Sequence, residues 1–273
     1  MPPAIPSADL AYSAPRAIGA VNWTGLWTLY AKEVRRFAKV WAQTLFAPLV
    51  TTLMFLGIFV LAVGGAVNQV GGVGFGEFLA PGLTMMAMIQ NAFTNTSSSI
   101  VISKVQGNIV DVLMPPLSPA ELTLAYVGAG ITRGVMVGAL NMLALSPFVS
   151  VQIHDFGLIA FHAVAASSLL AMLGLMGGIW ADKFDHLAAV GNFVITPLSF
   201  LSGTFYSIER LPGIWLDIAH VNPFFFMIDG FRAGFIGHAD GSLWLGIVVM
   251  LGLNAVFAAI CLWMFRSGYK LKS

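Results

Sequence analysis

One arginine stands deep inside a long apolar stretch of this sequence, where a charged side chain is costly. Arg133 interrupts the apolar run at about 122–149, and His162 is the other ionisable residue deep in such a run. A charge at membrane depth marks a functional site by default. Arg133 therefore either lines a pathway through the membrane or extends its long side chain to the inner headgroups. The sequence leaves both interpretations open.

The acidic residues are placed differently, because none lies deep in a long apolar run. Ion-coupled transporters usually carry Asp, Glu or His inside the helix bundle to bind the coupling ion. The five histidines are scattered and the single cysteine, Cys261, lies in an apolar run, so we predict no catalytic residue and no metal site. An ion-coupled transporter or channel, and a membrane-embedded enzyme, are the less favoured function classes.

The composition predicts a membrane protein. Of the 273 residues, 58% are hydrophobic and 9% are charged, whereas a soluble domain carries about 25% charged residues. A chain with so few charges cannot cover a soluble surface. The net charge of +1 gives no indication of a nucleic-acid partner, and membrane lipids are the expected surroundings.

The charge-poor stretches predict an all-α membrane protein with six transmembrane helices. Each stretch is compared with the roughly 20 residues that cross a bilayer core. Ten of the 13 basic residues fall on one side of such a bundle, so both termini are expected in the cytoplasm. No cleavable signal peptide is recognised, because the first long apolar run begins only after Lys39. The predicted spans are about 44–63, 78–103, 120–149, 157–180, 187–201 and 243–265. They belong to a single transmembrane domain at 21–273. The tail at 1–20 is rich in proline and alanine and is predicted to be disordered.

An amphipathic helix is predicted at about 22–41, before the first span. Aromatic and apolar residues recur there every three or four positions, from Trp23 to Trp41, and basic residues lie on the opposite side. Such a helix lies flat in the headgroup region. It either anchors the first span or also contacts a cytoplasmic partner. The charged residues of this interface helix are Lys32, Glu33, Arg35 and Arg36.

The cytoplasmic loop between the second and third spans contains a second short amphipathic segment, at 106–113. Pro115 and Pro116 must end it, and Ser118, Pro119 and Glu121 then form the pattern of a capped helix start. A short helix held rigidly between two spans can transmit motion, although a plain connector is the alternative. The residues of interest here are Gln106, Gly107, Asn108, Ile109, Asp111 and Leu113.

The segment after the fifth span is too polar to cross a membrane and too aromatic for water. We expect re-entrant or interfacial helices at about 203–235, which act either as an outer gate or as a lid that stabilises the bundle. The candidate gate residues are Gly203, Tyr206, Glu209, Pro223 and Phe224. In the third span, Gly130, Gly134 and Gly138 recur every four residues. They indicate close helix packing, within one subunit or at a dimer seam.

Five segments carry a family resemblance. They read AKEVRRFAKVWAQTLFAPLVTTLMF (31–55), FLAPGLTMM (78–86), GNIVDVLMPPLSP (107–119), FLSGTFYSIERLPGIW (200–215) and NPFFFMIDGFRAGFIG (222–237). The chain resembles type-2 ABC exporter permeases over about residues 20–270, most closely the YadH-like branch related to NodJ permeases.

The resemblance implies the transmembrane subunit of an ATP-driven exporter in a bacterial inner membrane. A homodimer of permeases would carry two ATP-binding subunits in a 2+2 assembly, and an amphiphilic drug, lipid or glycolipid would cross by alternating access. The family's coupling helix would map onto 106–113 and its re-entrant helices onto 203–235. This sequence has no GxxxxGK[ST] phosphate loop, so ATP and Mg²⁺ are expected in the partner subunit and no cofactor is expected in this chain.

Overall fold

The structure is a computed structural model that describes residues 19–64, 69–70, 72–208 and 211–271. The predicted tail at 1–20 lies almost entirely outside these residues. The described chain is a helical bundle with one short antiparallel hairpin, β1 (Gln69–Val70) and β2 (Val73–Gly74). Its helices are α1 (Trp23–Ala38), α2 (Ala47–Val63), α3 (Phe75–Val105), α4 (Ile109–Leu113), α5 (Pro119–Leu145), α6 (Phe156–Trp180), α7 (Phe184–Val190), α8 (Thr196–Phe200), α9 (Ile214–Val221), α10 (Pro223–Ile236) and α11 (Leu243–Ser267), with π-helical turns η1 (Ala42–Phe46) before α2 and η2 (Gly191–Ile195) before α8.

Four described helices are long and apolar enough to cross a membrane. They are Ala42–Ala62, Pro119–Leu145, Phe156–Trp180 and Leu243–Ser267. Helix α3 has 31 residues, or about 46 Å at 1.5 Å per residue, but its many Asn, Thr and Ser residues make it less apolar. The segment 184–200 is divided among α7, η2 and α8. An all-α membrane protein fits the prediction, and the count of six spans stays a prediction.

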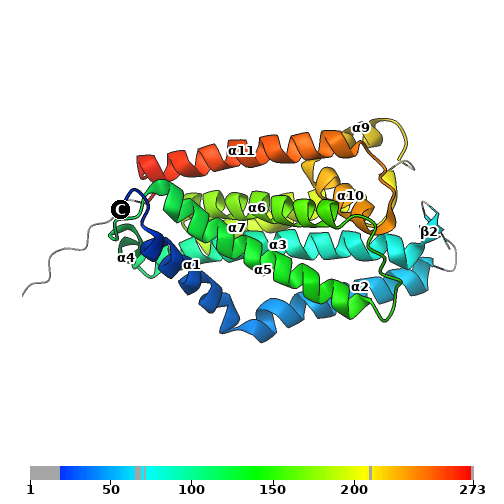
Figure 1. Cartoon of the computed structure of the whole chain (residues 1–273), viewed down its shortest axis with the longest axis horizontal. Helices are drawn as coiled ribbons and strands as arrows, with labels where there is room; N and C mark the ends of the chain where they lie inside the picture. The colour runs from blue at the N-terminus through cyan, green and yellow to red at the C-terminus, as the bar shows by residue number, and fades with distance from the viewer. Residues whose placement is uncertain (1–18, 65–68, 71, 209–210, 272–273) are drawn as a thin grey trace, which may run out of the picture.

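The long helices run side by side along one axis, which gives the bundle two distinct ends (Figure 1). Helix α4 and the C-terminal end of α11 lie at one end. The β hairpin, α9 and α10 lie toward the other end. The predicted cytoplasmic loop and the predicted external segment are therefore at opposite ends, as the predicted topology requires.

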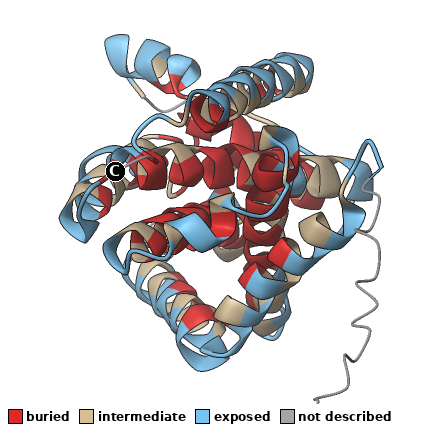
Figure 2. Cartoon of the chain, turned by 90° about the vertical axis from the view of Figure 1, so that its left-hand side faces the viewer, coloured by how far each residue is buried: buried red, intermediate tan, exposed pale blue. Residues whose placement is uncertain are grey.

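Helices α3, α5 and α6 form the centre of the bundle, and α2 and α11 lie at its outside. In the most apolar stretch of α6, 56% of the residues are buried, whereas the fraction is 11% for Ala42–Ala62 and 17% for α11. Figure 2 shows the buried residues gathered toward the middle and exposed residues on the outer faces. The outer faces of α2 and α11 are therefore available to lipid or to another protein.

Glycines allow the three central helices to approach closely. A Cβ atom on Gly134 of α5 would lie 2.6 Å from Ser167 Oγ of α6 and 3.2 Å from the backbone oxygen of Met88 in α3. Gly130 faces the same two helices, with Ala171 of α6 as its nearest neighbour, and Gly138 faces Met88 of α3. The glycines of the third predicted span thus pack within one subunit, which decides between the two interpretations of their spacing.

The predicted start of α5 is confirmed in detail. Ser118 Oγ accepts a hydrogen bond from Glu121 N at 3.3 Å, and Glu121 Oε2 accepts one from Ser118 N at 2.6 Å. Pro119 occupies the first helical position. This capping box satisfies two backbone donors that the helix itself cannot, and it fixes where the loop ends.

The close packing of α6 on α3 can be tested at Gly174. A Cβ atom there would overlap the backbone oxygen of Phe93 and Thr96 Oγ1, so Gly174→Ala should destabilise the fold by about 1–3 kcal/mol through overpacking. Gly252→Ala is the matched control, because the space around Gly252 in α11 is open. We expect thermal unfolding in detergent to show a lower midpoint for the first variant only. Equal midpoints would contradict this packing.

Candidate functional site

Helix α3 presents a row of polar side chains between two outer helical segments. Gln90, Thr94 and Ser98 recur every four residues and are at least partly exposed. Gln90 and Thr94 line a cavity of about 400 Å³ against η1 and α2. All three line a second cavity of about 400 Å³ against 184–200. We call this region the polar cleft: its floor is the row on α3, and its walls are η1–α2 on one side and segment 184–200 on the other.

Both walls contain a π-helical turn, η1 and η2, at the level of the cleft. Such turns widen the helix locally and are frequent at functional sites. Threonine hydroxyls bond to the loosened backbone: Thr44 Oγ1 donates to the oxygen of Phe37 at 3.1 Å, and Thr196 Oγ1 donates to that of Gly191 at 3.0 Å. The two walls are thus alike in construction.

Arg133 reaches the polar cleft from α5. Its side chain is buried, at 8% exposure, and Nη2 donates to Asn91 Oδ1 of α3 at 2.8 Å. It lines the cavity between α2 and α3. Of the two positions that the sequence left open for Arg133, the structure has the side chain inside the bundle, against α3.

The interface helix α1 is fastened to α3 by a charged residue. Arg36 Nη2 donates to the backbone oxygen of Asn95 at 2.6 Å and to its Oδ1 at 3.1 Å. Arg36 Nε also pairs with Glu33 Oε2 at 3.0 Å, and Glu33 is fully buried. Lys32 and Arg35 are exposed, so the predicted group of four charges is divided between solvent and bundle.

The aromatic side of α1 is divided as well. Trp23 and Trp27 are 71% and 65% exposed, while Leu29 and Phe37 are buried with Glu33 on the face toward the bundle. The sequence pattern places all the aromatic residues on one face and the basic residues opposite. The structure shows a helix with one face on the protein and exposed tryptophans, which suit the headgroup region.

The loop around α4 lies at the end of the bundle where α3 stops. The helix covers Ile109–Leu113 and is shorter than predicted. Gln106, Gly107, Asn108 and Asp111 are exposed, whereas Ile109 and Leu113 are half-buried against the core.

Sequence reasoning missed two outward apolar residues of this loop. Val110 is 53% exposed and Met114 is 77% exposed, while Val112 between them is buried. Five of the six residues in IVDVLM are apolar, so the pattern cannot show which of them face outward.

The loop and α1 are joined to each other. Asn22 Nδ2 donates to the backbone oxygen of Pro116 at 3.2 Å, and Asn22 N donates to Glu121 Oε1. Glu121 therefore binds the start of α1 and the start of α5 with one carboxylate. A displacement of the loop would be passed to both helices.

Two lysines hold the end of α6 beside this loop. Lys104 Nζ donates to the backbone oxygens of Ile179 and Ala181 at 2.8 and 2.7 Å, and Lys270 Nζ donates to Asp182 Oδ2 at 2.9 Å. Cations suit these positions because the helix end carries unpaired carbonyls. The hydrogen bond from Lys270, helped by its charge and that of Lys104, lowers the pKa of the Asp182 carboxyl.

At the opposite end, four phenylalanines join the two walls of the polar cleft. The rings of Phe59 and Phe205 stack at 4.7 Å between centroids, and Phe205 also lies 5.2 Å from Phe200 and 6.1 Å from Phe55. Phe55 and Phe59 come from α2, and Phe200 ends α8. We call these four residues the aromatic cluster. It connects α2 to the end of segment 184–200.

The predicted gate residues lie next to the aromatic cluster, in a region with many buried residues and hydrogen bonds. Gly203 is buried with φ +74°, Tyr206 and Pro223 are half-buried, and Phe224 is buried. Glu209 falls outside the described residues. Twelve of the 14 residues of α10 are buried, so protein covers this predicted re-entrant helix.

Arg232 ties α10 to its surroundings. Nη2 donates to the oxygen of Gly203 at 2.7 Å, and the guanidinium lies 3.7 Å from the centre of the Phe78 ring in α3. Asp229 of α10 accepts hydrogen bonds from the backbone of Asp240 and Gly241 at 2.8 and 3.0 Å. These contacts hold the segment behind the aromatic cluster in place.

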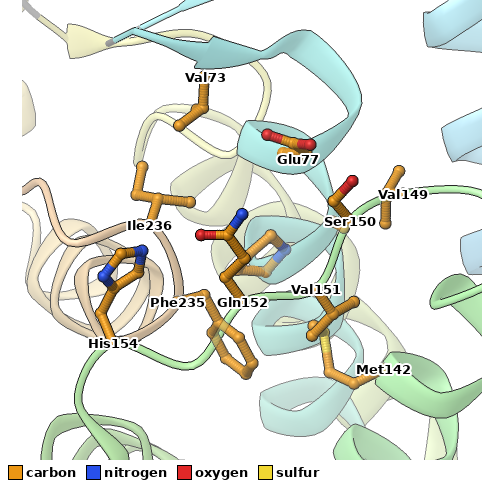
Figure 3. A pocket seen from close by; sticks show the side chains of 12 residues that line it. Val73, Glu77, Met142, Val149, Ser150, Val151, Gln152, His154, Phe235 and Ile236 are labelled. Atoms are coloured by element: carbon orange, nitrogen blue, oxygen red, sulfur yellow. The ribbon is translucent and has the colours of Figure 1, made fainter.

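Three other cavities lie outside the polar cleft. A pocket beside the hairpin is lined by Glu77, Gln152 and His154 among others (Figure 3), but its volume of about 50 Å³ has room only for a few water molecules. An apolar groove of about 550 Å³ runs between α5, α6 and α10. A cavity of about 520 Å³ lies between α2 and residues 148–150, where Glu77 lines it. The polar cleft combines a row of polar side chains with the buried Arg133, and it is therefore the candidate site.

Comparisons with known proteins agree on one family. Residues 24–236 match the family described as ABC-2 type transporter. The chain is 36% identical to the inner membrane transport permease YadH of Escherichia coli K12 over 251 residues, which is 92% of this chain and 98% of that protein. It is 26% identical to nodulation protein J of Neorhizobium galegae over 256 residues, which is 89% of this chain and 93% of that protein.

The attachment of α1 to α3 can be tested by removing the Arg36 charge. Arg36→Met leaves Glu33 buried without its cation, which should cost roughly 2–3 kcal/mol. Arg35→Met, on the exposed side of α1, is the matched control and should change little. Thermal unfolding of the purified protein measures both. A similar small effect of the two variants would mean that α1 is not held by Arg36.

Proposed function

This chain belongs to the ABC-2 type transporter family, and on that premise we propose that it is the permease of an ATP-driven exporter for an amphiphilic molecule. As a member of this family it is the transmembrane subunit of an ABC transporter. The observation that carries the proposal is the polar cleft, because polar side chains at membrane depth cannot face lipid tails without cost. Water, a substrate or another protein must cover them.

A second copy of the chain is the proposed cover of the polar cleft. The two walls, η1–α2 and 184–200, are the outermost parts near the cleft, and they expose apolar side chains such as Met54 and Phe193. Two copies that meet along these walls would enclose two clefts as one pathway. In this arrangement α3 and 184–200 also span the bilayer, which makes six spans, with both termini in the cytoplasm.

The energy is proposed to enter through the loop that carries α4. Each copy would bind one ATP-binding subunit, with the exposed Val110 and Met114 in a groove of that subunit. ATP binding and hydrolysis would then take place in the partner. Because the loop is bonded to α1, α3 and α5, its displacement would reach both sides of the polar cleft.

Alternating access is the proposed cycle. The aromatic cluster, which connects the two walls, would be the gate at the end near the hairpin, and the substrate would enter the cleft from the side of α1 and α4. ATP would draw the loops together, separate Phe59 from Phe205 and release the substrate outward across the inner membrane. The polar floor and apolar walls suit a molecule with one polar and one apolar part.

No observation favours ion coupling. Within the described residues, Arg133 is the one ionisable side chain that lines the two cleft cavities. A cation cannot bind a proton or sodium ion as a carboxylate would.

If the exposed residues around α4 form the coupling contact, charged substitutions there should release the ATP-binding subunit from the permease. Val110→Glu combined with Met114→Glu would bury two carboxylates in an apolar contact and should weaken binding by roughly a hundredfold, or about 3 kcal/mol. The measurement is the amount of ATP-binding subunit retained when the tagged permease is purified from native membranes. Ile214→Glu, an exposed apolar position at the other end of the bundle, is the control. Full retention by the double variant would contradict the contact.

If the aromatic cluster is the outer gate, its packing decides whether a reagent can reach the cleft from the external side. Cysteine is placed at the cleft floor by Thr94→Cys in a Cys261→Ser background, and intact cells are treated with a membrane-impermeant maleimide. Phe59→Ala with Phe205→Ala should raise the labelling rate several-fold, because the packed rings exclude water. Phe148→Ala, an exposed phenylalanine near the same end, should not. Fast labelling without any Phe substitution would contradict a closed gate.

A further inference from the structure

Arg133 has more hydrogen-bond donors than the protein uses. A guanidinium offers five N–H groups, and the hydrogen bond from Nη2 to Asn91 Oδ1 is its single bond to the described residues. Its Nε is buried with no partner. In the described part of the chain no carboxylate pairs with it. A buried charge left in this state is costly, which indicates that something outside the chain completes it.

The neighbouring arginine does not have this surplus. Asn91 and Asn95 are four residues apart on α3, so their side chains lie about 6 Å apart along one face. Asn95 binds Arg36 as Asn91 binds Arg133, but Arg36 also pairs with Glu33. Together, these contacts involve two cations, Arg36 and Arg133, and one anion, Glu33. The unmatched positive charge is that of Arg133.

The cavity in front of Arg133 has a polar part and an apolar part. Gln90 and Asn91 accompany the guanidinium, and Phe55, Leu83 and Met86 line the cavity as well. Its volume of about 400 Å³ lies in the range of sites for small molecules, roughly 300–1,000 Å³. A free inorganic anion would leave the apolar part unused.

We infer that Arg133 is the head-group-binding residue of the polar cleft, and that the transported molecule is an amphiphile with an anionic head group such as a phosphate, sulfate or carboxylate. This inference rests on the proposed function and names its substrate class. The free N–H groups of Arg133 bind the head group, since charge-assisted hydrogen bonds to such oxygens are strong. Asn91 holds the guanidinium in place, and its own Nδ2 donates to the oxygen of Ala87 at 2.9 Å, which fixes Oδ1 toward Arg133.

The test measures binding of radiolabelled dodecyl phosphate to the purified complex in phosphatidylcholine nanodiscs, with empty nanodiscs as the blank. Unlabelled dodecyl sulfate should displace the probe. Dodecylphosphocholine and dodecyltrimethylammonium, which have the same chain and no net negative charge, should be at least about tenfold weaker competitors. Equal displacement by all three would overturn the inference. Displacement by inorganic phosphate at the same concentration as dodecyl phosphate would overturn the amphiphilic part.

Three variants locate the site. Arg133→Gln should weaken dodecyl phosphate binding by about tenfold or more, whereas Arg266→Gln, at an exposed arginine of α11, should not. Asn91→Asp loses the Nδ2 hydrogen bond to Ala87 but supplies an internal carboxylate to Arg133, so the guanidinium stays paired within the protein and anion binding should be lost. If Arg133 is only a brace between α5 and α3, Asn91→Asp will bind the probe like the parent protein, and the inference is wrong.

The same samples separate this inference from the proposed function. Their subunit composition and ATP hydrolysis are measured before the binding assay. An intact, ATP-hydrolysing complex that does not distinguish head-group charge overturns the inference alone. A permease that binds dodecyl phosphate through Arg133 but carries no ATP-binding subunit overturns the coupling mechanism instead.

Discussion

A bilayer core offers no hydrogen-bond partner, so every polar group at that depth must find one within the protein. Helix α3 is where this constraint acts most strongly, because it carries more polar residues than the other long helices. On its inner side the demand is met by close packing. Thr96 Oγ1 donates to the backbone oxygen of Ala171 in α6 at 2.7 Å, and Arg133 and Arg36 bind its two asparagines. On its outer side the Thr94 hydroxyl donates within its own helix, to the backbone oxygen of Gln90 at 2.8 Å. The side chain of Gln90 is left for water, substrate or a second copy, and the site follows from that difference.

The same constraint explains which parts are rigid and which can move. The glycine-lined contacts among α3, α5 and α6 leave no room for displacement, and the bonds of Asn22, Glu121 and Lys104 join α1 and the ends of α3, α5 and α6 at the end of the bundle where α4 lies. Helix α2 contacts this body through α3 and α5, and 11% of the residues in the most apolar stretch of Ala42–Ala62 are buried. Within one chain, motion that opens the aromatic cluster is therefore expected in the walls of the cleft, while the floors of the two copies move relative to each other as rigid bodies.

Local features of the sequence predicted much of this arrangement. The capping box at Ser118 and Glu121, the position of α4 between two long helices, and the covered helix at 223–236 follow from propensity and hydrophobic pattern. Long-range features did not follow. The side chains of Glu33 and Arg36 point into the bundle because Arg36 binds Asn95, which is about 60 positions away in the sequence. The aromatic cluster likewise brings Phe55 together with the distant Phe205. Nor could periodicity reveal the π-helical turns or choose Val110 and Met114 as the outward residues of α4, since these depend on what packs beside them.

The central claim is that two copies of this chain face each other across the polar cleft and move with ATP. A single spin label at Thr94, attached through Thr94→Cys in the Cys261→Ser background, tests it by pulsed dipolar spectroscopy on the complex with its ATP-binding subunit. One label per chain gives a dipolar signal only when two copies are held together. The account predicts such a signal, with a distance that changes between the nucleotide-free and the ATP-bound complex. An intact, ATP-hydrolysing complex with no dipolar signal, or with a distance that ATP does not change, would contradict it.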